Sequence, residues 1–249
     1  MTGGTNPQLE PYLASLRPVT VEVVREMYCA DSLVGADGKR TTLSKNVRID
    51  PAQGAALHEL ISTARVKSSL EIGLAYGFST AWILDALSRV PGASHVAIDP
   101  FQRTAYGEIG LETARRVDSA ASFEFIEERS DFVLASMAKE KKLFDFIYID
   151  GNHRFDDVIV DFYLSDRVLA VGGIVVFDDM WMRSIQSVVS FVEKNRCYKS
   201  IFTNVANIAV FKKLSIDDRD WTHFVPFEGR PRFANLKRRL VAKALRLFR

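Results

Sequence analysis

The chain has 249 residues, of which 47% are hydrophobic and 26% are charged, and its formal net charge is +2. This composition predicts a soluble enzyme with one substantial hydrophobic core. Cys29 and Cys197 are too few for a disulfide framework or a cysteine-based zinc site, and the longest apolar run, residues 168–177, is shorter than the roughly 20 residues that cross a bilayer. Because no signal segment is visible at the amino terminus, these features predict a cytoplasmic protein.

Residues 1–50 are irregular, and we expect them to form a cap segment over the active site. A helix is predicted over Val19–Ala30, and the stretch Gly35–Lys45 is rich in turn residues.

The next predicted helix has Asp50 as its N-cap and Pro51 at its first helical position, and it ends just before a buried strand. His58 lies on this helix. We expect a packing or surface histidine there rather than a catalytic one.

A glycine-rich turn joins a buried strand to a helix in the segment Ser69–Thr80, which has the spacing E-x-G-x-x-x-G-x-S. Glu71 ends a short apolar run, Gly73 and Gly77 allow close approach of the backbone, and helical periodicity resumes at Phe78. Open α/β sheets bind ligands at the end of such a strand. The spacing differs from the G-x-G-x-x-G pattern of dinucleotide sites, which disfavours a nicotinamide dehydrogenase and favours a cofactor without phosphates.

This segment resembles the first motif of the class I S-adenosylmethionine-dependent methyltransferases, in which an acidic residue precedes G-x-x-x-G at the end of the first strand. The resemblance implies that Glu71, Gly73, Gly77 and Ser79 contact S-adenosylmethionine. Tyr76, inside the turn, is expected to touch the methionine part of the cofactor.

Strand-like apolar runs alternate with helix-like stretches after residue 50, which predicts a parallel, doubly wound sheet. Only a short polar turn separates the last two runs, so we expect them to pair antiparallel at the edge of the sheet. The predicted fold class is therefore α/β, with a mostly parallel seven-stranded sheet and an antiparallel edge strand, as in the methyltransferase fold. The predicted strands are Ser69–Ile72, His95–Ile98, Phe123–Glu127, Phe144–Ile149, Gly173–Phe177, Lys199–Thr203 and Ile208–Phe211.

Further cofactor contacts are predicted after the second and third strands. Asp99 follows the glycine turn by about 20 residues, where a carboxylate can accept two ribose hydroxyls; a helix cap or a loop-stabilising aspartate is the alternative. Ser130 and Asp131 lie at a predicted helix start, a position that meets the adenine in the resembled family. An ordinary N-cap is also open there, and both roles can hold at once.

Two strands end in the acidic residues that carry the predicted chemistry. Asp150 follows one strand, and Asp178 and Asp179 follow the next. Neighbouring strands lie about 4.8 Å apart, so we expect these carboxylates to crowd one pocket. At about 4 Å and an effective dielectric of about 20, two carboxylates repel by roughly 4 kcal/mol, which favours bound protons or a bound cation. Oxygen ligands favour magnesium, with manganese as a substitute.

Over residues 50–212 this arrangement resembles the metal-dependent O-methyltransferases. They include catechol O-methyltransferase and bacterial enzymes that methylate macrolide sugars or a cephalosporin nucleus. The resemblance implies that Asp150, Asp178 and Asp179 hold the metal and that Asp150 also contacts the cofactor. The catechol group carries a lysine three residues beyond its first metal acid, and His153 occupies that position here.

The resulting hypothesis is Mg-dependent transfer of a methyl group from S-adenosylmethionine to a hydroxyl of a small molecule or sugar. In it, Asp150 and His153 are catalytic, and the imidazole removes the hydroxyl proton because histidine ordinarily titrates at about 6.5. The alternative for His153 is a polar loop residue with no part in proton transfer. Trp181 lines the acceptor pocket or packs in the core, and packing is favoured.

Two other functions are kept open. A metal-independent methyltransferase would use the same acids to orient another acceptor, such as an amine. A non-catalytic module would keep the cofactor site and be recruited to a membrane by its carboxyl-terminal segment. Cofactor turnover with added magnesium separates the leading hypothesis from the non-catalytic module.

The predicted domain organisation is a cap segment (1–50), a catalytic domain (51–213) and an extension (214–249). Residues 229–249 contain eight Lys or Arg and no Asp or Glu, so their formal charge is +8. Because the formal net charge of the whole chain is +2, residues 1–228 carry a net charge of −6. Apolar residues recur in this tail at helical spacing, so a basic amphipathic helix is predicted. It could bind anionic lipid on the inner face of a membrane, or pack on the body or on a second subunit of a homo-oligomer.

Nucleic acid is not expected as a partner of the basic tail. The body is acidic and has no aromatic-basic strip, and no Asn-Pro-Pro-Tyr type of motif follows the fourth strand. The expected partner is therefore a small-molecule or glycan acceptor.

Overall fold

The computed structural model describes residues 7–117 and 119–227, so the predicted basic helix at 229–249 lies outside the described residues. The chain forms two compact units, unit 1 (Met1–Ser130) and unit 2 (Asp131–Arg249). The three-part division at residues 50 and 213 stays a prediction. Within the described ranges, no helix has both the length and the apolar character needed to cross a membrane.

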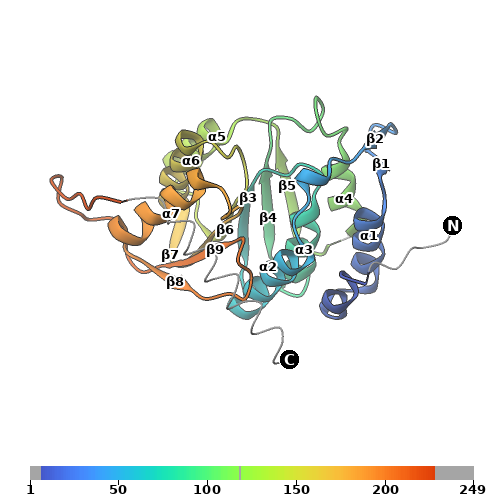
Figure 1. The fold of residues 1–249 in the computed structure, drawn as a ribbon, viewed down its shortest axis with the longest axis horizontal. Coiled ribbons are helices and arrows are strands. Elements are labelled where there is room, and N and C mark those ends of the chain that lie inside the picture. Colours follow the sequence, from blue (N-terminus) through green and yellow to red (C-terminus); the bar gives the residue numbers. More distant parts are fainter. Residues whose placement is uncertain (1–6, 118, 228–249) are drawn as a thin grey trace. The chain divides into compact units, whose positions relative to one another are not determined.

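Three parallel strands form the sheet of unit 1 in the order β5-β4-β3 (Figure 1). Ile72, Ile98 and Ile126 lie in register at their carboxyl ends. The residues that follow β3 and β4 therefore emerge side by side, as the alternation of apolar runs predicts. The bounds are β3 Ser68–Ile72, β4 Ser94–Ile98 and β5 Ser122–Ile126.

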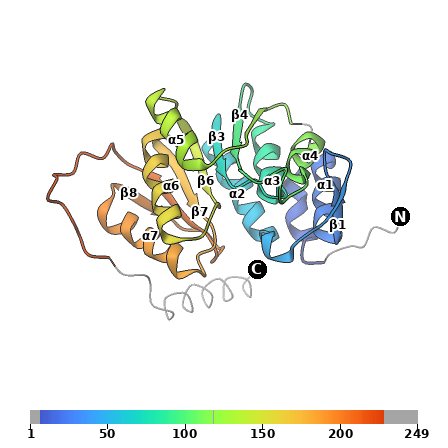
Figure 2. The same cartoon turned by 90° about the horizontal axis from the view of Figure 1, so that it is seen from above.

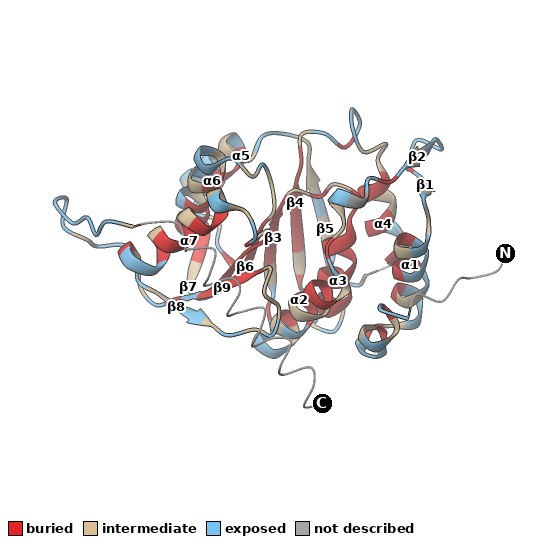
Figure 3. Cartoon of the chain, in the orientation of Figure 1, coloured by how far each residue is buried: buried red, intermediate tan, exposed pale blue. Residues whose placement is uncertain are grey.

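Helix α3 (Phe78–Leu87) is the central helix of unit 1, and all ten of its residues are buried (Figure 3). It packs against α1, α2 and α4. The start of α2 matches the sequence prediction, because Asp50 is its N-cap in a capping box with Gln53 and Pro51 is its first residue. The other helices of unit 1 are η1 (Glu10–Ser15), α1 (Pro18–Cys29), η2 (Lys45–Val47), α2 (Pro51–Ala64) and α4 (Ile109–Val117).

A small hairpin occupies the turn-rich stretch near residue 40. Its strands, β1 (Ser32–Val34) and β2 (Arg40–Thr42), pair antiparallel and form a sheet of their own. The sequence predicts a turn-rich stretch over Gly35–Lys45 but not these strands, because three-residue strands carry almost no periodic signal.

Unit 2 contains four strands in the order β6-β7-β9-β8. Strands β6 and β7 are parallel, whereas β9 runs antiparallel to both β7 and the edge strand β8. Helices α6 and α7 lie side by side against these strands (Figure 2). The bounds are α5 Ser130–Lys139, β6 Phe144–Ile149, α6 Phe155–Val168, β7 Leu169–Phe177, α7 Arg183–Asn195, β8 Tyr198–Ile201 and β9 Ala209–Lys213.

The predicted fold class is confirmed: the chain has a mostly parallel seven-stranded sheet with an antiparallel pair at one edge, flanked by helices. All seven predicted strands are present. The largest difference is that β7 begins at Leu169 rather than at Gly173, since Leu169 pairs with Phe144 before an irregularity in the register.

Candidate functional site

The glycine-rich turn of unit 1 depends on backbone angles that favour glycine. Gly73, Ala75 and Gly77 all have positive φ, at 94°, 45° and 79°. Gly77 is also the N-cap of α3, and a Cβ atom at this residue would lie 3.0 Å from the Cβ of Thr113. The turn therefore runs close to α4 and leaves little room for a side chain at Gly77.

Glu71 lies under this turn and is fully buried. Its two carboxylate oxygens accept hydrogen bonds from the hydroxyls of Ser79 and Thr80, the latter at 2.6 Å. The imidazole Nε2 of His95, on the neighbouring strand, lies 3.2 Å from the second oxygen. Glu71 thus ties the end of β3 to the first turn of α3, and its predicted contact with the cofactor stays a prediction.

Asp99 follows β4 and faces the glycine turn. Its Oδ2 accepts hydrogen bonds from the backbone N–H groups of Leu74 (3.0 Å) and Ala75 (2.7 Å), and its Oδ1 accepts one from Phe101 (2.7 Å). The loop-stabilising role left open by the sequence is therefore present. The contact with a ribose stays a prediction.

The remaining predicted cofactor residues of this region lie at two positions. Tyr76 is buried, and its ring meets Tyr106 edge-on with centroids 5.2 Å apart, while its hydroxyl lies 3.5 Å from the carbonyl oxygen of Thr42. Helix α5 begins at Ser130 and carries Asp131 in its first turn, as predicted. Tyr76 therefore links the turn to the β1-β2 hairpin.

The acidic residues of unit 2 follow paired strands. Ile149 of β6 pairs with Phe177 of β7, so Asp150 and Asp178 begin the loops beyond the same end of the two strands. The backbone N–H of Asp178 donates to the carbonyl of Ile149 at 3.1 Å. The sequence prediction that these acids emerge together is borne out by this pairing.

Asp178 is buried, and its carboxylate is engaged by neighbouring groups of unit 2. The hydroxyl of Tyr148 donates to Oδ2, while the backbone N–H of Asp179 (2.7 Å) and the side-chain amide of Asn207 (3.2 Å) donate to Oδ1. Asp178 therefore holds together the ends of β6, β7 and the turn before β9.

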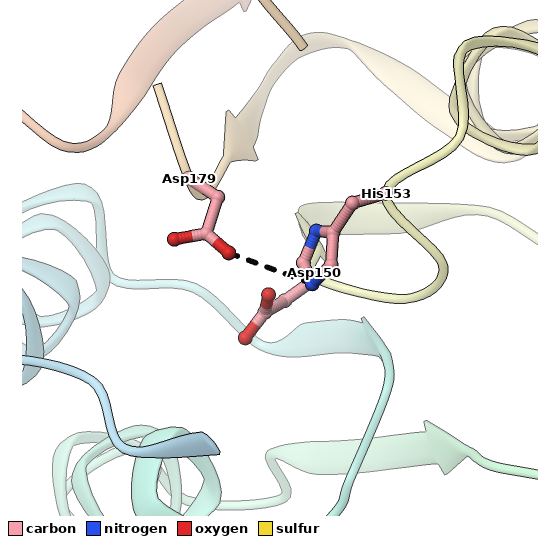
Figure 4. Close-up of side chains that lie close together, drawn as sticks. All are labelled: Asp150, His153 and Asp179. Atoms are coloured by element: carbon pink, nitrogen blue, oxygen red, sulfur yellow. Dashed lines mark ion pairs between the residues drawn. The ribbon is translucent and has the colours of Figure 1, made fainter. Parts of the chain in front are cut away.

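Asp150, His153 and Asp179 form a group whose potential ligand atoms all lie within 4.8 Å of one another. Figure 4 shows the three side chains converging, with Nε2 of His153 3.4 Å from Oδ2 of Asp179. All three residues are partly exposed. The structure thus places the side chains of Asp150, Asp179 and His153 close together, whereas Asp178 has the separate set of partners described above.

Asp179 has a positive φ of 52°, which is uncommon for a residue other than glycine. The strained turn is held by hydrogen bonds from the N–H of Met182 to the carbonyl of Asp179 and from the N–H of Met180 to the carbonyl of Asn207, both at 2.8 Å. Such strain is concentrated at functional sites.

Three neighbours orient this group. The indole N–H of Trp181 donates to Oδ1 of Asp179 at 2.8 Å, and the amide of Asn207 donates to the same atom at 3.2 Å. Ser184 donates from its hydroxyl to the carbonyl of His153 at 2.6 Å. Trp181 is 60% exposed, so the expectation that it packs in the core is wrong.

Sequence reasoning missed five residues of these networks: Thr80, His95, Tyr148, Ser184 and Asn207. Tyr148 could have been found, because it lies two residues before Asp150 and so shares its face of the strand; its hydroxyl is 3.4 Å from the Asp150 carboxylate. Asn207 lies 28 residues from Asp179 in a polar turn, and no spacing rule connects the two.

The charge of the group in unit 2 favours a cation. Within the part of the chain that the structure describes, no lysine or arginine forms an ion pair with Asp179; its ion-pair partner is His153. Two carboxylates and an imidazole are donors that divalent metals accept. The residues therefore fit the metal ion that the resemblance implies.

Residues 70–180 match a protein family described as a methyltransferase domain. The fold is similar to that of the O-methyltransferase TomG from Streptomyces achromogenes (TM-score 0.60, 16% identity, 86% of this chain and 93% of that chain). It is also similar to an O-methyltransferase from Bacillus cereus (0.56, 17%, 84% and 92%) and to a putative caffeoyl-CoA O-methyltransferase from Staphylococcus aureus (0.57, 17%, 82% and 96%). No curated protein sequence gives a significant match.

The match to the methyltransferase domain covers the glycine turn, Asp99, Asp150, Asp178 and Asp179. Together with the sheet topology, it agrees with the resemblance of the sequence to the class I S-adenosylmethionine-dependent methyltransferases.

Proposed function

We propose that the protein transfers a methyl group from S-adenosylmethionine to a hydroxyl of a small molecule or sugar, with a divalent cation at Asp150 and Asp179. The observation that carries this proposal is the group of Asp150, His153 and Asp179 in a methyltransferase domain. TomG takes part in tomaymycin synthesis, and another neighbour is named for caffeoyl-CoA, which supports a small hydroxylated acceptor.

In this proposal unit 1 binds the cofactor. The glycine turn lets the backbone approach it, and Asp99, already fixed by three backbone N–H groups, retains carboxylate lone pairs for the ribose hydroxyls. The hydrogen bonds from Ser79 and Thr80 to Glu71 hold the start of α3 in place under the turn. Two neighbouring structures contain S-adenosylmethionine or S-adenosylhomocysteine, which supports this choice of cofactor.

Unit 2 activates the acceptor. Asp150 and Asp179 would hold the cation, and Trp181 and Asn207 would keep the Asp179 carboxylate in its direction. A cation bound there would lower the pKa of an acceptor hydroxyl and orient its oxygen toward the methyl group. Two roles are open to His153: it removes the hydroxyl proton, as the sequence suggests, or it binds the cation.

The test measures formation of S-adenosylhomocysteine from S-adenosylmethionine with a panel of phenols, catechols and sugars. We expect activity with Mg²⁺ or Mn²⁺ that is abolished by EDTA. Asp179→Asn removes one charge at nearly constant size, and we expect at least about a hundredfold loss of activity, a loss of about 2.7 kcal/mol in transition-state stabilisation. Binding of S-adenosylhomocysteine by the variant, measured by calorimetry, is the control for folding.

Two outcomes favour the alternative functions. Full activity in EDTA would indicate a metal-independent methyltransferase acting on another acceptor. Tight binding of S-adenosylhomocysteine without turnover on any acceptor, amines included, would favour a non-catalytic cofactor-binding module.

A further inference from the structure

We propose that His153 is a ligand of the cation rather than the base, so that the site binds manganese(II) or cobalt(II) in preference to magnesium. The inference rests on the proposed function, because it concerns the same site. It replaces the three carboxylates expected from the sequence by two carboxylates and one imidazole.

The positions of the donor atoms fit a single ion. Around an octahedral ion with ligands at about 2.1 Å, adjacent donors lie about 3 Å apart and opposite donors about 4.2 Å apart. The potential ligand atoms of Asp150, His153 and Asp179 lie within 4.8 Å of one another, and the Nε2 to Oδ2 distance is 3.4 Å. Small side-chain shifts would therefore bring all three donors to one ion.

The hydrogen bonds around Asp179 leave one of its oxygens to face the imidazole. Trp181 and Asn207 both donate to Oδ1, whereas Oδ2 is the atom that lies near Nε2 of His153. A base would need Nε2 to face the acceptor hydroxyl, but in this arrangement it faces the ligand oxygen of Asp179. A cation between Nε2 of His153 and Oδ2 of Asp179 would accept a lone pair from each of these atoms.

Asp178 is a poor third ligand by the same reasoning. It is buried, and its oxygens accept hydrogen bonds from Tyr148, from Asn207 and from the backbone of Asp179. Rotating the Asp178 carboxylate toward a bound cation would break the hydrogen bonds that hold three segments of unit 2 together. Its role is to position Asp179, because it accepts the Asp179 N–H at 2.7 Å.

The donor set determines which ion is preferred. Magnesium is a hard ion that takes oxygen ligands and keeps much of its water, whereas imidazole suits the transition metals. Replacing one carboxylate by a neutral imidazole also lowers the charge of the ligand set from −3 to −2, which weakens the purely electrostatic attraction on which magnesium depends. Manganese(II) and cobalt(II) gain from the nitrogen donor, so they should bind more tightly than magnesium.

The experiment is pulsed electron paramagnetic resonance on the full-length protein loaded with Mn²⁺, which detects a nitrogen nucleus bound to the ion. We expect a ¹⁴N signal in the wild type and its loss in His153→Gln. His223→Gln is the matched control and should keep the signal, because His223 is exposed and is not one of the three residues of the group. Calorimetry with Co²⁺ should show at least about a tenfold loss of affinity for His153→Gln, with less than about a threefold change for Mg²⁺.

A second variant keeps the inference testable if glutamine perturbs the loop. His153→Asp restores three carboxylates, and we expect it to shift the preference toward Mg²⁺ while S-adenosylhomocysteine still binds. Bound Mn²⁺ without a ¹⁴N signal in the wild type would overturn the inference and leave metal-dependent methyl transfer intact. No Mn²⁺ uptake, with the Asp179–His153 contact acting as an ion pair only, would overturn both the inference and the metal-dependent part of the proposed function.

Discussion

At the scale of single residues, Asp85 shows how this chain stabilises a charge inside unit 1. It lies fully buried on α3. Thr20 donates to its carboxylate at 2.6 Å, the backbone N–H and Nε of Arg17 donate at 3.1 Å, and Nε2 of His58 lies 3.0 Å away. Burial alone raises the pKa of Asp85, but the hydrogen bonds from His58, Thr20 and Arg17 outweigh it and lower the pKa to about 2.

This lowered pKa predicts a loss of stability in acid. An unfolded aspartate titrates at about 3.9, so the ionised carboxylate favours the folded state at higher pH, and its contribution of about 2 kcal/mol disappears as the pH falls through this value toward 2. Urea unfolding between pH 5 and pH 2.5 should show that the free energy of unfolding of Asp85→Asn depends less on pH than that of the wild type. The exposed Asp218→Asn is the control. An unchanged pH dependence in Asp85→Asn would contradict the assignment.

Residues of the candidate site could be predicted where they follow strands. A carboxylate at the end of an apolar run is a strong local pattern, and this pattern identifies Asp99, Asp150, Asp178 and Asp179 as candidates. His95 was missed because it lies inside a strand, where an apolar residue would serve the same pattern; its contact with Glu71 exists only once β3 and β4 pair. Pairing across strands has no signal in one sequence.

At the scale of elements, the crossing of α2 and α3 depends on one glycine. Gly54 lies in α2, and a Cβ atom there would be 2.3 Å from Nε1 of Trp82, a fully buried residue of α3. No side chain fits at that distance without movement of the helices. Helix propensity favours alanine over glycine by about 1 kcal/mol, so the crossing and not the helix requires glycine here.

Gly54→Ala is therefore expected to destabilise the protein although it improves the helix. The cost of overpacking is about 1–3 kcal/mol, and it should appear as a lower urea midpoint with the same slope. The control is a double-mutant cycle with Trp82→Phe, which shortens the side chain that clashes. We expect the cost of Gly54→Ala to fall in that background. Equal costs in both backgrounds would show that the indole is not the cause.

The start of α2 could be predicted, whereas the β1-β2 hairpin and the start of β7 could not. Asp50, Pro51 and Gln53 specify the helix start through contacts with their own neighbours. By contrast, Leu169 becomes part of β7 because it pairs with Phe144, and Ser32 pairs with Thr42 across a turn. Long-range pairing decides such short pieces, and local propensity does not.

At the scale of the whole molecule, the order of elements predicted the fold better than any single motif. Seven apolar runs with helices between the first six admit few arrangements, because parallel strands need crossover helices and the last two runs have none between them. The acceptor could not be predicted, since the loops that contact it carry no comparable pattern.

The carboxyl-terminal part of the chain gives the last prediction. The segment before residue 228 exposes Ile216, Trp221 and Phe224, which are 72%, 93% and 65% exposed, and the eight basic residues of 229–249 follow it in the sequence. Basic groups near an anionic lipid surface contribute about 1 kcal/mol each, and exposed aromatic side chains favour the interface.

We therefore predict that the full-length protein floats with vesicles containing phosphatidylserine, that a 1–228 truncation does not, and that neither binds neutral vesicles. High salt should release the protein, because the attraction is electrostatic. Trp221→Ser should weaken flotation less than the truncation does, since it removes one apolar group and none of the charges. Equal flotation of the full-length and truncated proteins would exclude lipid as the partner of this segment and favour its packing on the body or on a second subunit.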